Sequence, residues 1–117
     1  MFARASESSG GSGNEPFYIC YYGYHGYYNV LPPSNTIKQY KYVELLSAAK
    51  WFAETGVNTV NGSVPNVRFN WTGSSNYTLT PDTPLDISAL NIPDNVQVGI
   101  IGMEASGWSY IPLKFYN

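Results

Sequence analysis

Apolar and polar residues alternate with a period of two along much of the chain, and this pattern predicts short β-strands. Residues 17–31 are rich in tyrosine and other β-favouring side chains. Gly23 and Gly26 interrupt this run, which predicts two strands or one bulged strand. Apolar residues also alternate with polar ones over 67–72 and over 76–80, and the Gly-Ser-Ser loop between these runs predicts a β-hairpin.

Two segments connect the predicted strands. Residues 57–64 carry Asn61-Gly62 at their centre, the pair best suited to a two-residue type I′ turn, which predicts another hairpin. Residues 81–95 contain three prolines and predict a long connection that carries the chain from one sheet to another. Beyond it, residues 96–103 are almost continuously apolar and predict a central strand covered on both sides.

The first and last strands are predicted to bury alternate residues. Trp108 to Phe115 closes the chain as a strand whose apolar positions 111, 113 and 115 face inward. In the first strand, Phe17, Ile19 and Tyr21 are predicted to face inward, so that the residues between them share the other face. Both faces of that strand then need cover. The predicted helix or the second sheet can cover one of them by packing within the chain, and an interface with another protein chain is the alternative.

A change to helical spacing predicts one amphipathic helix over about residues 37–55. Thr36 to Gln39 has the form of a capping box, and Gly56 stands where a glycine commonly follows a helix. An extended first turn is the alternative. The predicted buried face consists of Tyr42, Leu45, Leu46, Ala49, Phe52 and Ala53.

About six short strands and one helix predict a mainly β fold, a small antiparallel β-sandwich or barrel with one amphipathic helix. A two-layer α+β arrangement is the alternative. Residues 1–15 form a Gly/Ser-rich arm that offers little apolar area to bury, and residues 16–117 form a single β-rich domain. We expect the arm to become ordered only on a neighbouring molecule, because its own composition cannot offset the entropy of ordering it.

Charge and apolar content restrict the partners. Charged residues make up only 12% of the chain, with a formal net charge of −2, so we expect no nucleic-acid partner. No apolar run approaches the length of a membrane span, and residues 1–4 lead into Ser and Gly without the core of a signal peptide. We therefore expect a soluble protein, made in the cytoplasm and not inserted in a membrane. The sequons at Asn61, Asn70 and Asn76 suggest secretion in a eukaryote, or chance in a chain rich in Asn, Ser and Thr.

Catalytic and metal-binding signatures are weak. Cys20 and His25 are the only cysteine and histidine; on a regular strand, residues five apart project to opposite faces, which disfavours a catalytic pair. One His and one Cys also fall short of a zinc ligand set, and we expect no metal and no cofactor. The aspartates at 82, 86 and 94 suit turns and caps better than a calcium loop. An enzyme that uses Cys20 or His25 is the least favoured of three functional hypotheses.

Aromatic residues are the unusual feature of the composition. They make up 16% of the chain, and seven of them lie between Phe17 and Tyr28. Tyrosine is amphipathic and loses little rotamer entropy when fixed, which suits contact surfaces that are wet before binding. Trp51 falls opposite the apolar stripe of the predicted helix, which indicates that the helix has either two apolar neighbours within the chain or a partner there. The predicted interface residues are Tyr18, Tyr22, Tyr24, Tyr27, Tyr28 and Trp51.

These features favour a non-enzymatic structural protein that binds protein subunits, either its own copies or a larger assembly. In its low charge, its polar uncharged composition and its Gly/Ser arm, the chain resembles the small structural proteins of virus particles, such as capsid-decorating or appendage proteins. The alternative is a lectin-like carbohydrate-binding module, because exposed Tyr and Trp can stack on sugar rings beside Asn and Asp side chains. An assembly protein should cover its aromatic rings with protein, whereas a sugar-binding module should leave them open.

Overall fold

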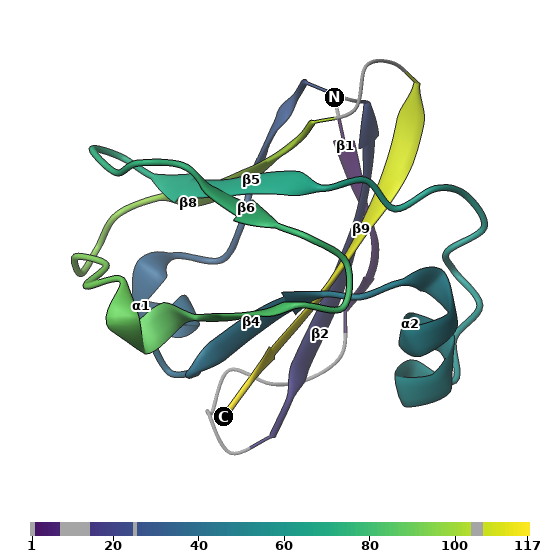
Figure 1. Cartoon of the computed structure of the whole chain (residues 1–117), viewed down its shortest axis with the longest axis horizontal. Helices are drawn as coiled ribbons and strands as arrows, with labels where there is room; N and C mark the ends of the chain where they lie inside the picture. Colours follow the sequence, from purple (N-terminus) through teal and green to yellow (C-terminus); the bar gives the residue numbers. More distant parts are fainter. Residues whose placement is uncertain (1, 8–14, 25, 104–106) are drawn as a thin grey trace.

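Nine strands form two antiparallel sheets in the computed structural model, which describes residues 2–7 by their backbone and residues 15–24, 26–103 and 107–117 in full. The strands of the five-stranded sheet lie in the order β1 (Phe2–Glu7), β2 (Phe17–Tyr24), β9 (Trp108–Tyr116), β4 (Tyr42–Leu45) and β7 (Pro84–Asp86). The four-stranded sheet has the order β3 (Tyr28–Val30), β8 (Val98–Gly102), β5 (Val67–Trp71) and β6 (Tyr77–Leu79). The two sheets face each other across a shared core (Figure 1), which confirms the predicted mainly β, sandwich-type fold.

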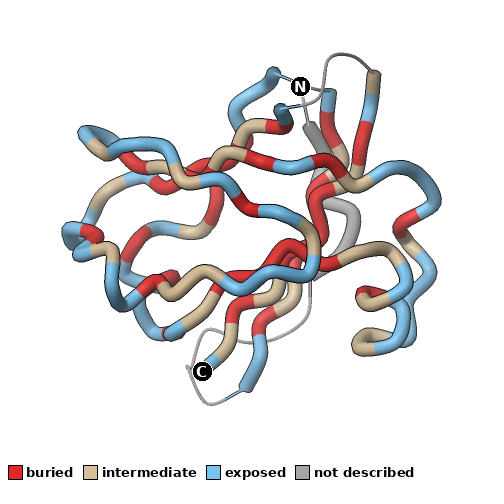
Figure 2. The backbone as a smooth tube through the Cα atoms, viewed as in Figure 1, coloured by how far each residue is buried: buried red, intermediate tan, exposed pale blue. Residues whose placement is uncertain are grey.

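The inward faces of β2 and β9 are those that the alternation predicted. Phe17, Ile19 and Tyr21 are buried in the core, as are the apolar residues at 111, 113 and 115 of β9. Buried segments line the space between the two sheets and exposed segments form the connections around it (Figure 2). Tyr21 also ties the sheets together, because its hydroxyl donates a hydrogen bond of 3.1 Å to the carbonyl of Val30 in β3.

The predicted hairpin and central strand of the second sheet are also confirmed. β5 and β6 pair antiparallel with Val67 opposite Leu79. β8 lies between β3 and β5, and the ring of Tyr28 covers Gly99 so closely that a Cβ there would lie 2.1 Å from the ring. Gly99 is therefore the residue that admits an aromatic ring against the outer side of this strand.

The single helix predicted over residues 37–55 is wrong. The segment forms α1 (Ser34–Ile37), strand β4 and α2 (Ala48–Thr55). β4 inserts between β9 and β7, and this pairing outweighs the helical spacing of its apolar residues. The helix that does form begins at Ser47, whose hydroxyl accepts a hydrogen bond from the Lys50 amide, and ends at Gly56 in the left-handed conformation, with φ 70°.

The observed helix α2 is shorter than the predicted one, and it buries the opposite face. In α2, Trp51 is buried, whereas Ala49, Phe52 and Ala53 are exposed. The predicted stripe took its phase from Tyr42, Leu45 and Leu46, which lie outside α2. The prediction that Trp51 lies on the polar face of a helix is therefore wrong.

The predicted hairpin at Asn61-Gly62 is wrong as well. Residues 56–66 contain no strand and instead contact the five-stranded sheet. Val60 is buried there beside Cys20, and the Ser63 carbonyl accepts a hydrogen bond of 3.1 Å from the Tyr110 amide. Contacts with the sheet thus replace the local turn that the Asn-Gly pair favoured.

The connection over residues 81–95 crosses between the sheets, as predicted. It leaves β6 in one sheet, forms β7 in the other, passes through the short 3₁₀ helix η1 (Ile87–Ala89) and returns to β8. α1 and η1 lie on the same side of the sandwich (Figure 1). No helix among the described residues is long and apolar enough to span a membrane.

Part of the predicted arm pairs with its own domain. β1 runs antiparallel to β2, with Phe2 opposite Gly23 and Glu7 opposite Ile19. Residues 8–14 of the arm lie outside the described residues. Strand pairing within the chain therefore orders residues 2–7, an arrangement that composition did not indicate.

Candidate functional site

One end of the five-stranded sheet carries a cluster of aromatic side chains, which we call the aromatic end surface: Tyr22, Tyr24, Tyr27, Trp108 and Tyr110. The last residues of β2 and the first residues of β9 meet at this end, near the top of Figure 1. Tyr22 lies opposite Tyr110 and Tyr24 lies opposite Trp108, so all four side chains project from the outer face of the sheet. Tyr27 joins them through a turn in which its amide donates to the Tyr24 carbonyl.

The rings of the aromatic end surface contact one another. Trp108 stacks on Tyr22 with ring centroids 5.3 Å apart and meets Tyr24 edge-on at 5.5 Å. Tyr24 lies 5.6 Å from Tyr27, and Tyr22 lies 4.7 Å from Tyr110. These spacings are typical of favourable aromatic pairs, so the rings hold one another in place before any partner arrives.

Three rings of the aromatic end surface are exposed to solvent, whereas Tyr110 is more buried. Trp108 is 47% exposed, Tyr27 46% and Tyr24 39%, which is unusual for such large side chains in one cluster. Tyr110 lies deeper, with its ring against Gly62, and burial raises the pKa of its hydroxyl. All five side chains are tyrosine or tryptophan, so the chemistry of this surface is apolar contact with hydroxyl and indole donors around it.

Further along the same face, α2 covers the sheet through a layer of charged groups. Glu44 of β4 is 2% exposed; one of its oxygens lies 2.5 Å from Lys50 Nζ of α2, and the other accepts a hydrogen bond of 2.8 Å from the Tyr116 hydroxyl. The hydrogen bond to Glu44 raises the pKa of Lys50. Burial first and the bond to Glu44 second raise the pKa of Tyr116 far above its usual range, so the phenol remains neutral.

A second ion pair joins the other end of α2 to β9. Lys114 lies 2.7 Å from Glu54, and the Tyr18 hydroxyl donates a hydrogen bond of 2.9 Å to the same carboxylate. Burial would raise the pKa of Glu54, but the hydrogen bonds and the nearby positive charge outweigh it and lower the pKa. Burial and the bond to Glu54 raise the pKa of Tyr18 to about 12. These groups neutralise one another and fix α2 on the sheet.

The predicted interface residues divide into three locations. Tyr22, Tyr24 and Tyr27 belong to the aromatic end surface. Tyr18 lies under α2, where its ring meets Trp51 edge-on, and Trp51 is 1% exposed, with its indole nitrogen donating to the Thr59 hydroxyl. Tyr28 lies on the outer side of the four-stranded sheet.

Sequence reasoning missed Trp108 and Tyr110 as members of the aromatic end surface. Both lie in the predicted last strand. Which strand would pair with β9 was not visible in the sequence, because pairing across some 90 positions leaves no local pattern. The tryptophan at the start of this predicted strand is the one available signal.

Of the two residues first considered for catalysis, the structure describes only Cys20. Cys20 has no exposed surface and packs with Leu46, Trp51 and Val60, and burial raises the pKa of its thiol to about 12. A thiol in that state is neither a thiolate nucleophile nor accessible to a substrate at neutral pH. His25 lies outside the described residues. The described residues also contain no group of three or more His, Cys, Asp and Glu able to hold a metal ion.

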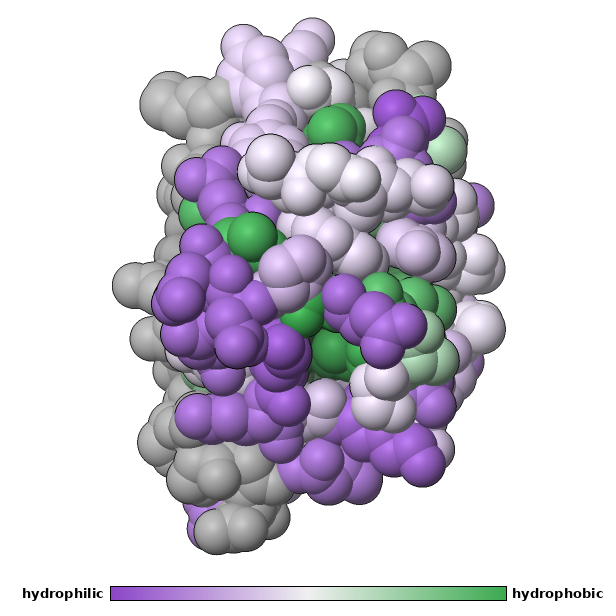
Figure 3. Space-filling view, turned by 90° about the vertical axis from the view of Figure 1, so that its left-hand side faces the viewer, coloured by the Kyte–Doolittle hydropathy of each residue, from purple (hydrophilic) through white to green (hydrophobic). Residues whose placement is uncertain are grey.

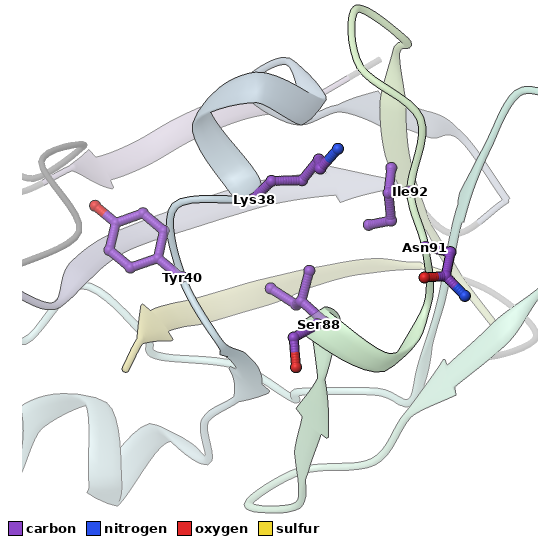
Figure 4. Close-up of a pocket in the computed structure, with 6 residues that line it drawn as sticks. Lys38, Tyr40, Ser88, Asn91 and Ile92 are labelled. Carbon is purple, nitrogen blue, oxygen red and sulfur yellow. The ribbon is translucent and has the colours of Figure 1, made fainter.

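A shallow cavity of about 290 Å³ lies between the end of α1 and η1 (Figure 4). Its lining combines Lys38, Tyr40, Ile87, Ser88, Asn91 and Ile92. Lys38 already pairs with Asp94 at 2.6 Å, and the Ser88 hydroxyl already donates to Asp86. This side of the molecule is mostly hydrophilic, with apolar atoms near its middle (Figure 3). The principal charged group of the cavity is thus engaged in structural contacts.

Comparison with known proteins finds no matching family model, no matching curated protein and no matching solved structure.

Proposed function

We propose that this protein is a non-enzymatic assembly protein that binds protein subunits through the aromatic end surface. The observation that carries the proposal is the contiguity of Tyr24, Tyr27 and Trp108, each 39–47% exposed. Large apolar groups gathered in one exposed cluster favour association, and aromatic residues dominate the energetics of protein interfaces. A net charge of −2 adds little repulsion between copies.

The low charge, the uncharged polar composition and the Gly/Ser arm suit a component of a virus particle, such as a capsid-decorating or appendage protein. The partner is then a second copy of the chain or another subunit of the particle. Preformed ring contacts support this role, because side chains that are already fixed lose little entropy when a partner covers them.

The experiment compares the self-association of the full chain with that of the double variant Tyr24→Ser/Trp108→Ser. Truncation of each interface anchor typically costs more than 1 kcal/mol, so we expect the dissociation constant measured by sedimentation to rise about a hundredfold for the pair. Phe52→Ser is the matched control, because Phe52 is 53% exposed on α2, outside the aromatic end surface. An equal effect of both variants would contradict a specific role for the aromatic end surface.

A carbohydrate-binding module is the second candidate, because the same open rings could stack on the apolar face of a sugar. It predicts a strictly monomeric chain that binds glycans on an array and loses this binding in Tyr24→Ser/Trp108→Ser. If the chain is monomeric and binds glycans, the carbohydrate-binding hypothesis replaces the assembly hypothesis.

A further inference from the structure

Strand β1 lies at the edge of the five-stranded sheet, where it pairs with one other strand. Its residues pair with β2 from Phe2 opposite Gly23 to Glu7 opposite Ile19, and β2 is its one neighbour in the sheet. The buried core of the described side chains begins at Phe17 and draws on both sheets. β1 is therefore an edge strand that main-chain pairing with β2 holds on the sheet.

The main-chain N–H and C=O groups along the outer edge of β2 require a neighbouring strand as their hydrogen-bond partner. Without β1, the outward N–H and C=O groups of residues 19–23 would have no strand partner, and unpaired edges of this kind recruit strands from other chains. β2 has eight residues and contains neither a charged residue nor proline, so it lacks the usual features that prevent edge pairing. It is a well-formed acceptor for any copy of β1.

The connection between the two strands is longer than their pairing requires. Nine residues, Ser8 to Pro16, lie between β1 and β2, whereas antiparallel strands can be joined by two to five. An extended chain spans at most about 3.3–3.6 Å per residue, so this connection reaches roughly 30 Å. The longest dimension of the molecule is 34 Å. The connection therefore spans most of the length of the molecule, which is enough to reach the β2 edge of a copy whose edge lies nearby.

We infer that the β2 edge is a strand-acceptor site and that its occupant in the assembly is β1 of a second copy of this chain. This inference rests on the proposed assembly function. Reciprocal exchange forms the same hydrogen bonds as pairing within one chain, so concentration and additional contacts set the balance between them. The site adjoins the aromatic end surface, since Ala3 of β1 lies opposite Tyr22. Contacts between copies at that surface therefore favour the exchanged form.

The experiment uses the single cysteine as a reporter of which β1 occupies the edge. Ser6 lies opposite Cys20, and directly opposed residues of antiparallel strands have Cα atoms about 4.5–5.5 Å apart, within the range of a disulfide. The full-length variant Ser6→Cys is refolded in a glutathione buffer, so that Cys20 can oxidise before it is buried. Non-reducing electrophoresis and peptide mapping then show whether the new disulfide lies within one chain or between two.

We expect bonds within one chain at about 10 μM and an increasing share of bonds between chains toward 1 mM, where protein concentration approaches the effective concentration that a short linker provides. The matched control Ser6→Cys/Cys20→Ser identifies dimers formed by the introduced thiol alone. Intrachain bonds only, at a concentration where sedimentation shows association, would overturn strand exchange and leave the aromatic interface standing. Absence of any disulfide bond between the introduced cysteine and Cys20 would overturn the pairing of β1 with β2. Persistence of interchain bonds in a Tyr24→Ser/Trp108→Ser background would separate strand exchange from the aromatic interface.

Discussion

Removal of the Glu44 carboxylate should destabilise the domain more than removal of any exposed acidic group. Glu44 is 2% exposed and joins β4 to both α2 and β9, through Lys50 at 2.5 Å and the Tyr116 hydroxyl at 2.8 Å. Glu44→Ala removes both contacts and leaves a small cavity beneath the helix. Glu44→Gln keeps the side-chain volume and an acceptor oxygen for Tyr116 but removes the charge opposite Lys50.

The expected change in the free energy of unfolding follows from the exposure of each contact partner of Glu44. A hydrogen bond to a charged group contributes about 1.5–3 kcal/mol, which applies best to the bond from Tyr116. The Lys50 side chain is 39% exposed and regains water when its partner is removed, so the ion pair between Lys50 and Glu44 contributes only about 1 kcal/mol to stability. We therefore expect Glu44→Ala to lower the free energy of unfolding by about 2–4 kcal/mol and Glu44→Gln to lower it by about 1 kcal/mol.

Urea unfolding followed by tryptophan fluorescence measures this difference. A domain of this size has a urea dependence of about 1–3 kcal/mol per molar, so the midpoint for Glu44→Ala should fall by roughly 0.7–4 M. Asp94→Ala is the matched control, because Asp94 pairs with Lys38 at a similar 2.6 Å but has a 72% exposed side chain. The control should change stability by less than about 0.5 kcal/mol. Equal losses for the two variants would refute the argument that burial makes the Glu44 contacts valuable.

Three further predictions concern the surroundings of α2. The pKa of Glu54 lies below its ordinary 4.5. The stability that this carboxylate contributes is therefore complete above pH 4.5 and disappears as the pH falls through the lowered pKa. When the pH is lowered, Glu54→Gln should lose less stability than the unchanged protein. Gly56→Ala should cost about 1–2 kcal/mol in thermal unfolding, because φ is 70° there, whereas Gly62→Ala should be nearly neutral, because its new methyl meets a ring at an ordinary 3.5 Å. The Cys20 thiol should react with a thiol reagent only as fast as the protein unfolds, and complete reaction within seconds under native conditions would contradict its burial.

The features that the sequence predicted correctly are those with a local cause. The inward faces of β2 and β9 follow from the two-residue period of a strand, which any stretch of alternating residues displays by itself. The hairpin of β5 and β6 needs only two alternating runs and a short loop between them. Gly56 marks the end of α2 because its left-handed conformation is costly for other residues.

The errors concern segments whose conformation depends on distant partners. Tyr42 to Leu45 has helical spacing but lies between β9 and β7, and strand pairing with both sides outweighs a weak local preference. Asn61-Gly62 favours a hairpin turn, yet contacts with the sheet hold this segment in an extended path. The aromatic end surface required β2 and β9 to pair in one register, so that Tyr24 meets Trp108 across a long sequence separation. Local preferences amount to about 1 kcal/mol or less per residue, whereas burial of a large side chain contributes about 1.5–3 kcal/mol, and for this reason tertiary packing decided which segments became strand, helix and exposed aromatic surface.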